Sequence, residues 1–347
     1  MRIGIVNDTP MMVEVLRRVI AETGRHELIW IARDGEEAVQ MCAWQLPDVV
    51  LMDLLMPKMD GVEATRRIMQ ATPCPILVVT SDMGTSAGKI YEAMGHGALD
   101  ATQTPALVGV AGKRDAAALI EKIDMLGRLP PEAAPAPVWP RAALGTARSH
   151  DGGVPLVAVG ASAGGPSALS LMLGAIAPDF AAAIVIVQHI DAAFAPGMAR
   201  WLQQHSALAV RLAEEGDQPR RGEVLLAGSN GHLVFKGGGG QALGYVAGAP
   251  DEVYLPSVDA FFHSIVRHWQ GSAVGVLLTG MGRDGALGLK ALRDNGCRTF
   301  AQDRKSCAVY GMPKAAVALG AAEEVLPVTA IAARLQGVLT STEGQQK

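Results

Sequence analysis

The feature that most constrains this chain is a repeated alternation of short, continuously apolar runs with helix-like stretches. In the first 126 residues the alternation occurs five times. A strand that is apolar at every position is buried on both faces, so this pattern predicts an α/β fold with a parallel sheet covered by helices. The expected strands are Ile3–Val6, Leu28–Ala32, Val49–Met52, Ile76–Val79 and Ala98–Thr102. The expected helices are Met11–Glu22, Glu36–Trp44, Val62–Gln70, Ala87–Met94 and Ala116–Leu126.

The same alternation resumes after residue 153 and predicts a second, doubly wound α/β domain. A chain of 347 residues is long enough for two such domains. The expected strands are Leu156–Val159, Ala183–Val187, Glu223–Ala227, Ala273–Leu278 and Thr299–Ala301. The expected helices are Ala168–Leu173, Gly197–Gln204, Asp259–Trp269, Leu287–Asp294 and Pro313–Leu319. The Gly237–Gly240 run is expected to form a hairpin turn, because glycine accepts positive φ at little cost.

A stretch rich in proline and alanine separates the two predicted domains. Proline stiffens the chain and removes backbone donors, so residues 128–153 are expected to form a semi-extended linker. The predicted boundaries are residues 1–127 for the first domain, 154–340 for the second and 341–347 for a frayed polar tail. Trp139 in the linker could be a docking anchor or a partly buried linker contact.

Charge and residue content exclude several classes of protein. A net charge of −4 and 4% aromatic residues argue against a general nucleic-acid binder. No signal peptide precedes the first strand, and the longest strongly apolar run, Phe180 to Val187, is too short to cross a bilayer. Scattered cysteines indicate reduced thiols rather than disulfides or a zinc site, and we expect a cytoplasmic protein. These cysteines are Cys42, Cys74, Cys297 and Cys307.

Polar residues follow the expected strands of the first domain at the end where ligand sites of open α/β sheets gather. Asn7 and Asp8 follow the first strand, Asp53 the third and Thr80 the fourth. Two carboxylates suit a hard cation such as Mg²⁺, beside which Asp53 could become an acyl phosphate and Thr80 could bond the phosphoryl oxygens. Alternatively, Asp8 caps the first helix and Asp53 caps a turn.

The segment PDVVLMDLLMPKMDG, which begins at Pro47, resembles the receiver domain of two-component response regulators. The resemblance implies that Asp53 is the phosphoacceptor, that Thr80 is the switch hydroxyl and that Asp8 and Asp53 bind Mg²⁺. Asn7 stands where receivers usually carry an acid, so it keeps an oxygen ligand but weakens the metal site. Thr104 replaces the usual lysine and Ala101 the usual switch aromatic, which puts the phosphorylation relay in question.

A second candidate site lies in VAVGASAGGP, residues 157–166, where a strand runs through small residues into a helix. Three motif interpretations compete. A dinucleotide fingerprint would need glycine at Ser162, and a phosphate-binding P-loop would need a lysine that is absent. Gly160-Ala161-Ser162-Ala163-Gly164 fits GxSxG, which presents a serine nucleophile near free amides at a helix start.

A serine nucleophile needs a base and a group that orients the base. His189 directly follows an apolar strand, whereas His205, His232, His263 and His268 are more easily structural, with His263 the least dismissible. Asp284 lies in TGMGRDG after another apolar strand, and its alternative role is to cap the helix near Ala286. The order Ser162, His189, Asp284 differs from that of α/β-hydrolases and argues against that fold.

Several motifs together resemble the chemotaxis protein-glutamate methylesterase family, in which a receiver is joined to a serine esterase. These are GASAGG, Gln188-His189, Pro256–Asp259, LTGMGRDG at Leu278–Gly285 and YGMPKAA at Tyr310–Ala316. The resemblance implies Ser162 as nucleophile, His189 as base, Asp284 as orienting acid, and the amides of Ala163 and Met281 as oxyanion donors. Alanine at position 163 replaces a threonine common in the family.

The resemblance also implies an activity and its partners. The chain would hydrolyse glutamyl methyl esters, and deamidate glutamines, on chemoreceptor helices without an esterase cofactor. A histidine kinase would phosphorylate the receiver, which covers the esterase site until it is phosphorylated. The opening MRIGIVND resembles a branch that serves surface sensing. The alternative is a phosphorylation-dependent binding module whose second domain is not catalytic.

Overall fold

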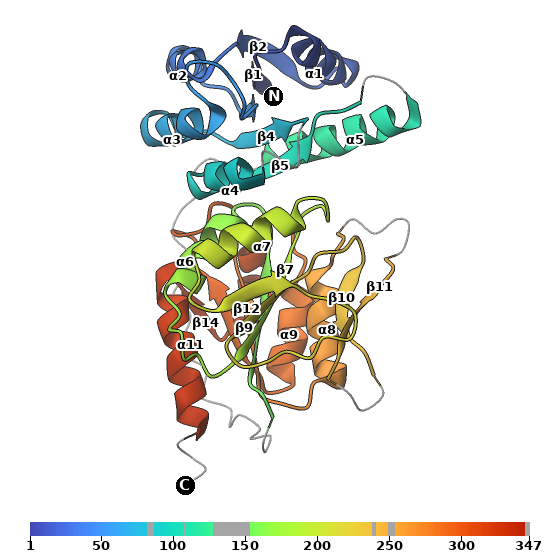
Figure 1. The fold of residues 1–347 in the computed structure, drawn as a ribbon, viewed down its shortest axis with the longest axis vertical. Coiled ribbons are helices and arrows are strands. Elements are labelled where there is room, and N and C mark those ends of the chain that lie inside the picture. Colours follow the sequence, from blue (N-terminus) through green and yellow to red (C-terminus); the bar gives the residue numbers. More distant parts are fainter. Residues whose placement is uncertain (82–86, 107–108, 128–152, 238–240, 249–253, 344–347) are drawn as a thin grey trace. The chain divides into compact units, whose positions relative to one another are not determined.

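A computed structural model describes residues 1–81, 87–106, 109–127, 153–237, 241–248 and 254–343 (Figure 1). The chain divides into two compact units, Met1–Ala136 and Pro137–Lys347. Residues 128–152 of the predicted linker, including Trp139, lie outside the described residues. In the part of the chain that the structure describes, no helix combines the length and the apolar character needed to span a membrane.

The first unit is a five-stranded parallel sheet of order β2-β1-β3-β4-β5. Its strands are β1 (Arg2–Val6), β2 (Glu27–Ala32), β3 (Val49–Met52), β4 (Ile76–Thr80) and β5 (Asp100–Gln103). Its helices are α1 (Pro10–Glu22), α2 (Gly35–Trp44), α3 (Gly61–Ala71), α4 (Ala87–Gly95) and α5 (Gly109–Leu126). Strand β3 is buried at every position, as continuously apolar residues require.

Helices cover both faces of this sheet because the chain changes direction after β2. Right-handed crossovers place α1 on one face and α2, α3 and α4 on the other, and α5 returns to pack beside α1. Aspartate N-caps begin two of these helices: the carboxylate of Asp34 accepts from the Glu37 amide at 2.9 Å and that of Asp60 from the Glu63 amide at 3.1 Å.

The second unit is built on a seven-stranded parallel sheet of order β14-β13-β12-β6-β7-β9-β8. Its strands are β6 (Leu156–Ala161), β7 (Ala183–Gln188), β8 (Ala209–Leu212), β9 (Glu223–Leu226), β12 (Ala273–Leu277), β13 (Arg298–Gln302) and β14 (Glu324–Leu326). Its helices are α6 (Gly165–Gly174), α7 (Ala195–Gln204), α8 (Val258–His268), α9 (Ala286–Asp294), α10 (Met312–Ala318) and α11 (Val328–Glu343). An antiparallel pair, β10 (His232–Phe235) and β11 (Leu243–Val246), lies outside this sheet.

Strand order reverses at β6, which pairs with β7 on one side and with β12 on the other. The crossover helices α6 and α9 therefore lie on opposite faces, as in the doubly wound fold expected from the sequence. Helix α6 packs with α7 and α11, whereas α8, α9 and α10 pack together (Figure 1). A buried core containing Phe261, Phe262 and Leu289 fills the space between these last helices and the sheet.

Several elements differ from the sequence-based expectation. Strands β8 and β14 and helix α11 were not predicted. Both strands are short and lie at the sheet edges, and only one of their residues is buried, so they lack the continuous apolar run that marks a buried strand. Helix α5 begins at Gly109 rather than Ala116, since its glycines weaken the helical signal. Helix α11 continues to Glu343, so residues 341–343 of the expected tail are helical. Strands β10 and β11 flank the predicted glycine turn, of which residues 238–240 lie outside the described residues.

Candidate functional site

Three strand ends at the centre of the seven-stranded sheet bring the predicted triad together. Ser162 follows β6, His189 follows β7, and Asp284 lies in the loop after β12. The three strands are neighbours, with Ala161 paired to Gln188 and Gly160 paired to Leu277. Residues that are 95 positions apart in the sequence therefore meet at the point where the strand order reverses, which is where ligand sites form in such sheets.

The Ser162 turn is held tightly by the backbone around it. The Ser162 amide donates to the Thr279 carbonyl at 3.0 Å, and the Ser162 carbonyl accepts from the Gly165 amide at 2.7 Å. Gly164 has φ 74°, and a Cβ there would lie 2.5 Å from Ala308 Cβ. A Cβ on Gly280 would lie 2.8 Å from Ser162 Cβ. Glycines are needed at both positions, because the loop after β13 packs against Gly164 and the loop after β12, which contains Gly280, packs against the serine.

Within the predicted triad, His189 and Asp284 are in direct side-chain contact. Their side chains are joined by a hydrogen bond of 2.7 Å between His189 Nε2 and Asp284 Oδ2. The second ring nitrogen, His189 Nδ1, is buried and has no hydrogen-bond partner among the described residues. Ser162 and His189 are thus neighbours that are not hydrogen-bonded in this structure. Because Asp284 accepts the Nε2 proton, Nδ1 is left as the basic nitrogen.

The Asp284 carboxylate is buried at the N-terminus of α8. It accepts from the Val258 amide at 2.6 Å, from the Asp259 amide at 3.0 Å and from Ser257 Oγ at 3.0 Å. Burial opposes ionisation, but the hydrogen bond from His189 and the α8 amides outweigh it and lower the pKa of Asp284. The group is therefore a stable anion beside the imidazole.

The alternative role considered for Asp284, a cap on the following helix, is not what the structure shows. The N-cap of α9 is Gly285, with φ 83°, and Asp284 instead occupies the N-terminus of α8. Sequence reasoning missed Ser257, which is the N-cap of α8 and donates to the carboxylate. It also missed Tyr254, whose ring stacks on His189. The PSVD motif contains Ser257, but only the fold brings this segment to the site.

The two backbone amides expected to bind an oxyanion lie in loops beside Ser162. Neither the Ala163 amide nor the Met281 amide donates to an acceptor within the described ranges. Ala163 is the next residue after the serine, and Met281 follows Gly280, which packs against the serine. Both amides are thus available to a ligand, as an oxyanion site requires.

Two of the other histidines considered from the sequence, His205 and His232, have structural environments. His205 Nδ1 bonds to the Trp201 carbonyl oxygen at 2.9 Å, and His232 Nδ1 accepts from the Ser257 amide at 3.0 Å. His232 thus supports the α8 N-terminus, behind the carboxylate of Asp284. His263 Nδ1 is buried and lacks a hydrogen-bond partner in the described chain, and burial lowers the pKa of this side chain.

A second set of predicted residues meets at the strand reversal of the first unit. Asn7 and Asp8 follow β1 and Asp53 follows β3, and these strands are paired. Asn7 Nδ2 donates to Asp53 Oδ2 at 3.0 Å, while the Thr9 amide donates to Asn7 Oδ1 at 2.9 Å. Burial, together with the negative charge of Asp8, raises the pKa of Asp53. Asp53 also caps its turn, accepting from the Leu54 amide at 2.7 Å.

The alternative role of Asp8 as a helix cap is not observed, because the N-cap of α1 is Thr9. Thr80 is buried at the end of β4, and its carbonyl accepts from the Thr104 amide at 3.0 Å. Ala101 is buried within β5. Thr104 directly follows β5, the strand that pairs with β4. The side chain at position 104, beside Thr80, is therefore neutral.

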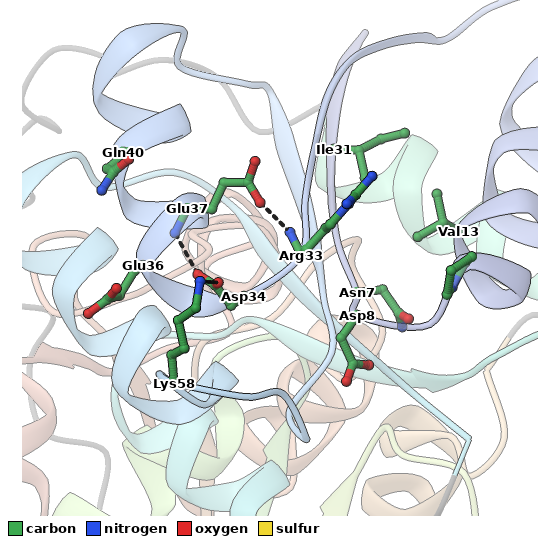
Figure 2. A pocket seen from close by; sticks show the side chains of 11 residues that line it. Asn7, Asp8, Val13, Ile31, Arg33, Asp34, Glu36, Glu37, Gln40 and Lys58 are labelled. Atoms are coloured by element: carbon green, nitrogen blue, oxygen red, sulfur yellow. Dashed lines mark hydrogen bonds and ion pairs between the residues drawn. The ribbon is translucent and has the colours of Figure 1, made fainter.

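A cavity of about 880 Å³ opens beside this carboxylate site (Figure 2). Asn7 and Asp8 line one side of it, but Asp53 is not among the lining residues. Lys58 reaches across to Asp34, with a 2.6 Å ion pair between Nζ and Oδ2. This ion pair joins the loop after β2 to the loop after β3. No group of three or more histidine, cysteine or acidic side chains in the described segments could hold a metal.

Comparison with known proteins assigns both units. Residues 157–335 match the model of the CheB methylesterase family, and residues 3–105 match the response regulator receiver domain. The chain belongs to the CheB methylesterase family. Both resemblances drawn from the sequence motifs are confirmed, and so is the two-domain α/β fold. The four cysteines are free thiols, with Cys42 and Cys74 buried and the other two half-buried.

Curated relatives match this chain over nearly its full length. A protein-glutamate methylesterase/protein-glutamine glutaminase of Cupriavidus pinatubonensis is 56% identical over 96% of each chain. One of Cupriavidus metallidurans is 54% identical over 100% of each chain. The crystal structure of the Thermotoga maritima CheB methylesterase catalytic domain has a TM-score of 0.52 at 31% identity, covering 54% of this chain and 99% of that domain.

Proposed function

We propose that this chain hydrolyses γ-glutamyl methyl esters on chemoreceptors and deamidates receptor glutamines. The observation that carries the proposal is the part-buried hydrogen bond between His189 Nε2 and Asp284, which leaves the buried Nδ1 as the basic nitrogen at the strand end next to that of Ser162. The family supports it, because close relatives are named protein-glutamate methylesterase/protein-glutamine glutaminase. The roles of the three residues are assigned from their geometry.

The first step is attack of the serine on the ester. His189 Nδ1 takes the proton of Ser162 Oγ as that oxygen bonds to the ester carbonyl carbon. The proton on Nε2 stays in its hydrogen bond with Asp284, whose negative charge stabilises the imidazolium that forms. A small shift of the two side chains must bring Ser162 and His189 into hydrogen-bond contact, as is common when substrate binds.

The tetrahedral intermediate carries its negative charge on the former carbonyl oxygen. The amides of Ala163 and Met281 donate to that oxygen, and loss of one such donor typically raises the barrier by about 3 kcal/mol. His189 then returns its proton to the leaving methoxide, and methanol departs. Water, activated by the same imidazole, hydrolyses the acyl-enzyme to a glutamate side chain. With a glutamine substrate the leaving group is ammonia.

Replacement of the nucleophile tests this proposal. We expect Ser162→Ala to lower kcat for methanol release from methylated receptor membranes roughly 10⁶-fold, as loss of the nucleophile does in serine proteases. Ser170→Ala is the matched control, because its hydroxyl donates only to the Ser167 carbonyl within α6 and should leave the rate unchanged. Retained activity in Ser162→Ala would overturn the assignment.

The alternative function, a binding module with a non-catalytic second domain, makes the opposite prediction. A serine-reactive organophosphonate should label Ser162 in the wild-type chain and leave Ser162→Ala unlabelled. An unlabelled wild-type chain that still binds receptor would support the binding module. The present arrangement favours the enzyme, because a purely structural role explains neither the basic nitrogen nor the open amides beside the serine.

We further propose that Asp53 accepts a phosphoryl group from a histidine kinase. The Asp8 and Asp53 carboxylates have no ion-pair partner in the described chain, and burial, together with the charge of Asp8, raises the pKa of Asp53. Two such carboxylates fit Mg²⁺, which would neutralise charge on the phosphoryl oxygens. Asn7 lies at this site, but its amide oxygen accepts from Thr9, so we assign the metal to Asp8 and Asp53. Thr80 is the proposed switch hydroxyl.

The receiver is proposed to inhibit the esterase until phosphorylation relieves the inhibition. A phosphoryl group on Asp53 adds negative charge at one end of the parallel sheet. Such a charge can shift the receiver between two alternative conformations of its packed elements. The receptor helix and the kinase are the partners in this scheme, and the cytoplasm is the proposed location. Service to a surface-sensing system stays a prediction drawn from the first eight residues.

A further inference from the structure

The aromatic ring over His189 has no role in the mechanism above. Tyr254 stacks on the imidazole with ring centroids 4.8 Å apart and an angle of 15° between the planes. This distance and angle are those of a favourable stacked ring pair. The His189 side chain is only 12% exposed, and Tyr254 packs against one face of its ring.

The opposite side of the site is shaped to receive the tyrosine. Gly282 has φ 77°, and a Cβ there would lie 2.2 Å from the Tyr254 hydroxyl oxygen. Gly282 lies in the same loop as Asp284, directly after Met281, whose amide is a proposed oxyanion donor. The tyrosine therefore contacts the base on one side and the acid-bearing loop on the other.

The segment that carries Tyr254 also holds the acid. Three residues farther along, Ser257 Oγ donates to Asp284, and the Val258 and Asp259 amides do the same. One short stretch of chain, residues 254–259, thus fixes the ring plane of His189 and the carboxylate of Asp284. A single hydrogen bond between Nε2 and the carboxylate leaves the imidazole free to rotate out of plane, and the stacked ring removes that freedom.

We infer that Tyr254 is a positioning residue for the esterase. It holds the imidazole in the plane that keeps Nε2 on Asp284 and directs Nδ1 to Ser162. This inference deepens the proposed function and rests on it. The face of the Tyr254 ring makes the contact with His189. We therefore assign the positioning role to the ring and not to the hydroxyl.

Two variants of the full-length chain separate ring from hydroxyl. Tyr254→Phe keeps the ring, and we expect kcat for methanol release within twofold of wild type. Tyr254→Leu removes the stack, and we expect kcat to fall at least tenfold while KM changes less than threefold. A change confined to KM would instead make Tyr254 a substrate contact and would overturn the inference.

Nuclear magnetic resonance of the histidine ring gives a readout that does not depend on turnover. In wild type and Tyr254→Phe, the proton on His189 Nε2 should be protected from exchange and appear at low field. In Tyr254→Leu, we expect that resonance to broaden or vanish while the backbone spectrum and the melting temperature are retained. An unchanged ring resonance together with an unchanged kcat would overturn the inference. An inactive wild type with the same ring signals would instead contradict the proposed function.

Discussion

At the esterase site, the role of a residue depends on which of its atoms remain free of hydrogen bonds to neighbouring residues. Asp284 occupies Nε2 of His189, so the base must be Nδ1. The GxSxG and TGMGRDG motifs predicted which residues take part, but a motif does not contain the ring orientation. That orientation depends on a contact between residues 95 positions apart, which no local pattern encodes.

Asp259 provides a residue-scale test of the electrostatics near the site. Burial and the charge of Asp284 raise the pKa of Asp259 to about 6 from an ordinary value of 3.8. The folded state therefore binds more protons than the unfolded state between these values, and stability should fall as pH rises from about 4 to 6. Asp259→Asn still accepts from the Gly288 amide but cannot ionise.

We expect Asp259→Asn to flatten this part of the pH profile. The variant should be more stable than wild type at pH 7 by on the order of 2 kcal/mol, because it avoids burying a charge and the repulsion of that charge by Asp284. Urea unfolding followed by fluorescence at several pH values measures the difference. Parallel profiles for the two proteins would show that Asp259 does not titrate in this window.

At the scale of elements, the long buried runs of both sheets were predictable and the short edge strands were not. Strands β3, β6 and β7 are buried at every position, so composition alone marks them. Strand β8 has only one buried residue of four, and nothing in its sequence distinguishes it from a loop. Helix α6 begins after a turn at Gly164, which has a left-handed backbone conformation. This conformation positions Ser162, and the residue composition of the turn does not reveal it.

The turn before α6 can be tested with two matched glycines. Gly164 and Gly222 both have φ 74°, but a Cβ at Gly222 meets nothing within 4 Å whereas one at Gly164 lies 2.5 Å from Ala308 Cβ. Each change to alanine should cost about 1–2 kcal/mol for the left-handed backbone. Gly164→Ala should lose more stability and most of the esterase activity, and Gly222→Ala should stay active. Equal melting temperatures and rates would contradict this account of the turn.

At the scale of the whole molecule, each of the two units has a site at the reversal point of its parallel sheet. In the first unit, β1 and β3 bring Asp8 and Asp53 together, and in the second, β6, β7 and β12 bring the triad together. Because the Asp53 site and the esterase site are built on separate cores, one site can regulate the other. This regulation is the proposed role of the receiver.

Regulation is tested by comparing the full chain with a version that cannot be phosphorylated. We expect a small-molecule phosphodonor with Mg²⁺ to raise methanol release by the full chain about 5–150-fold, the usual range of coupling between sites. Asp53→Asn should show the basal rate with and without the donor. The matched control, Asp48→Asn, changes an exposed carboxylate that pairs with Arg2 and should respond as wild type does. Identical responses of all three chains would remove the inhibitory scheme.

The sequence by itself determined the two α/β domains, the strand ends that carry polar residues and the family to which the chain belongs. The domains and the strand ends follow from local composition and spacing, because a buried strand must be apolar and a tight turn must be small, and the family follows from the resemblance of several motifs taken together. Only the tertiary structure decided that Asp284 lies at the N-terminus of α8, that Nδ1 of His189 is the open nitrogen and that Tyr254 covers the ring. Those features depend on contacts between distant segments, whose geometry is set by how the sheet and its helices pack.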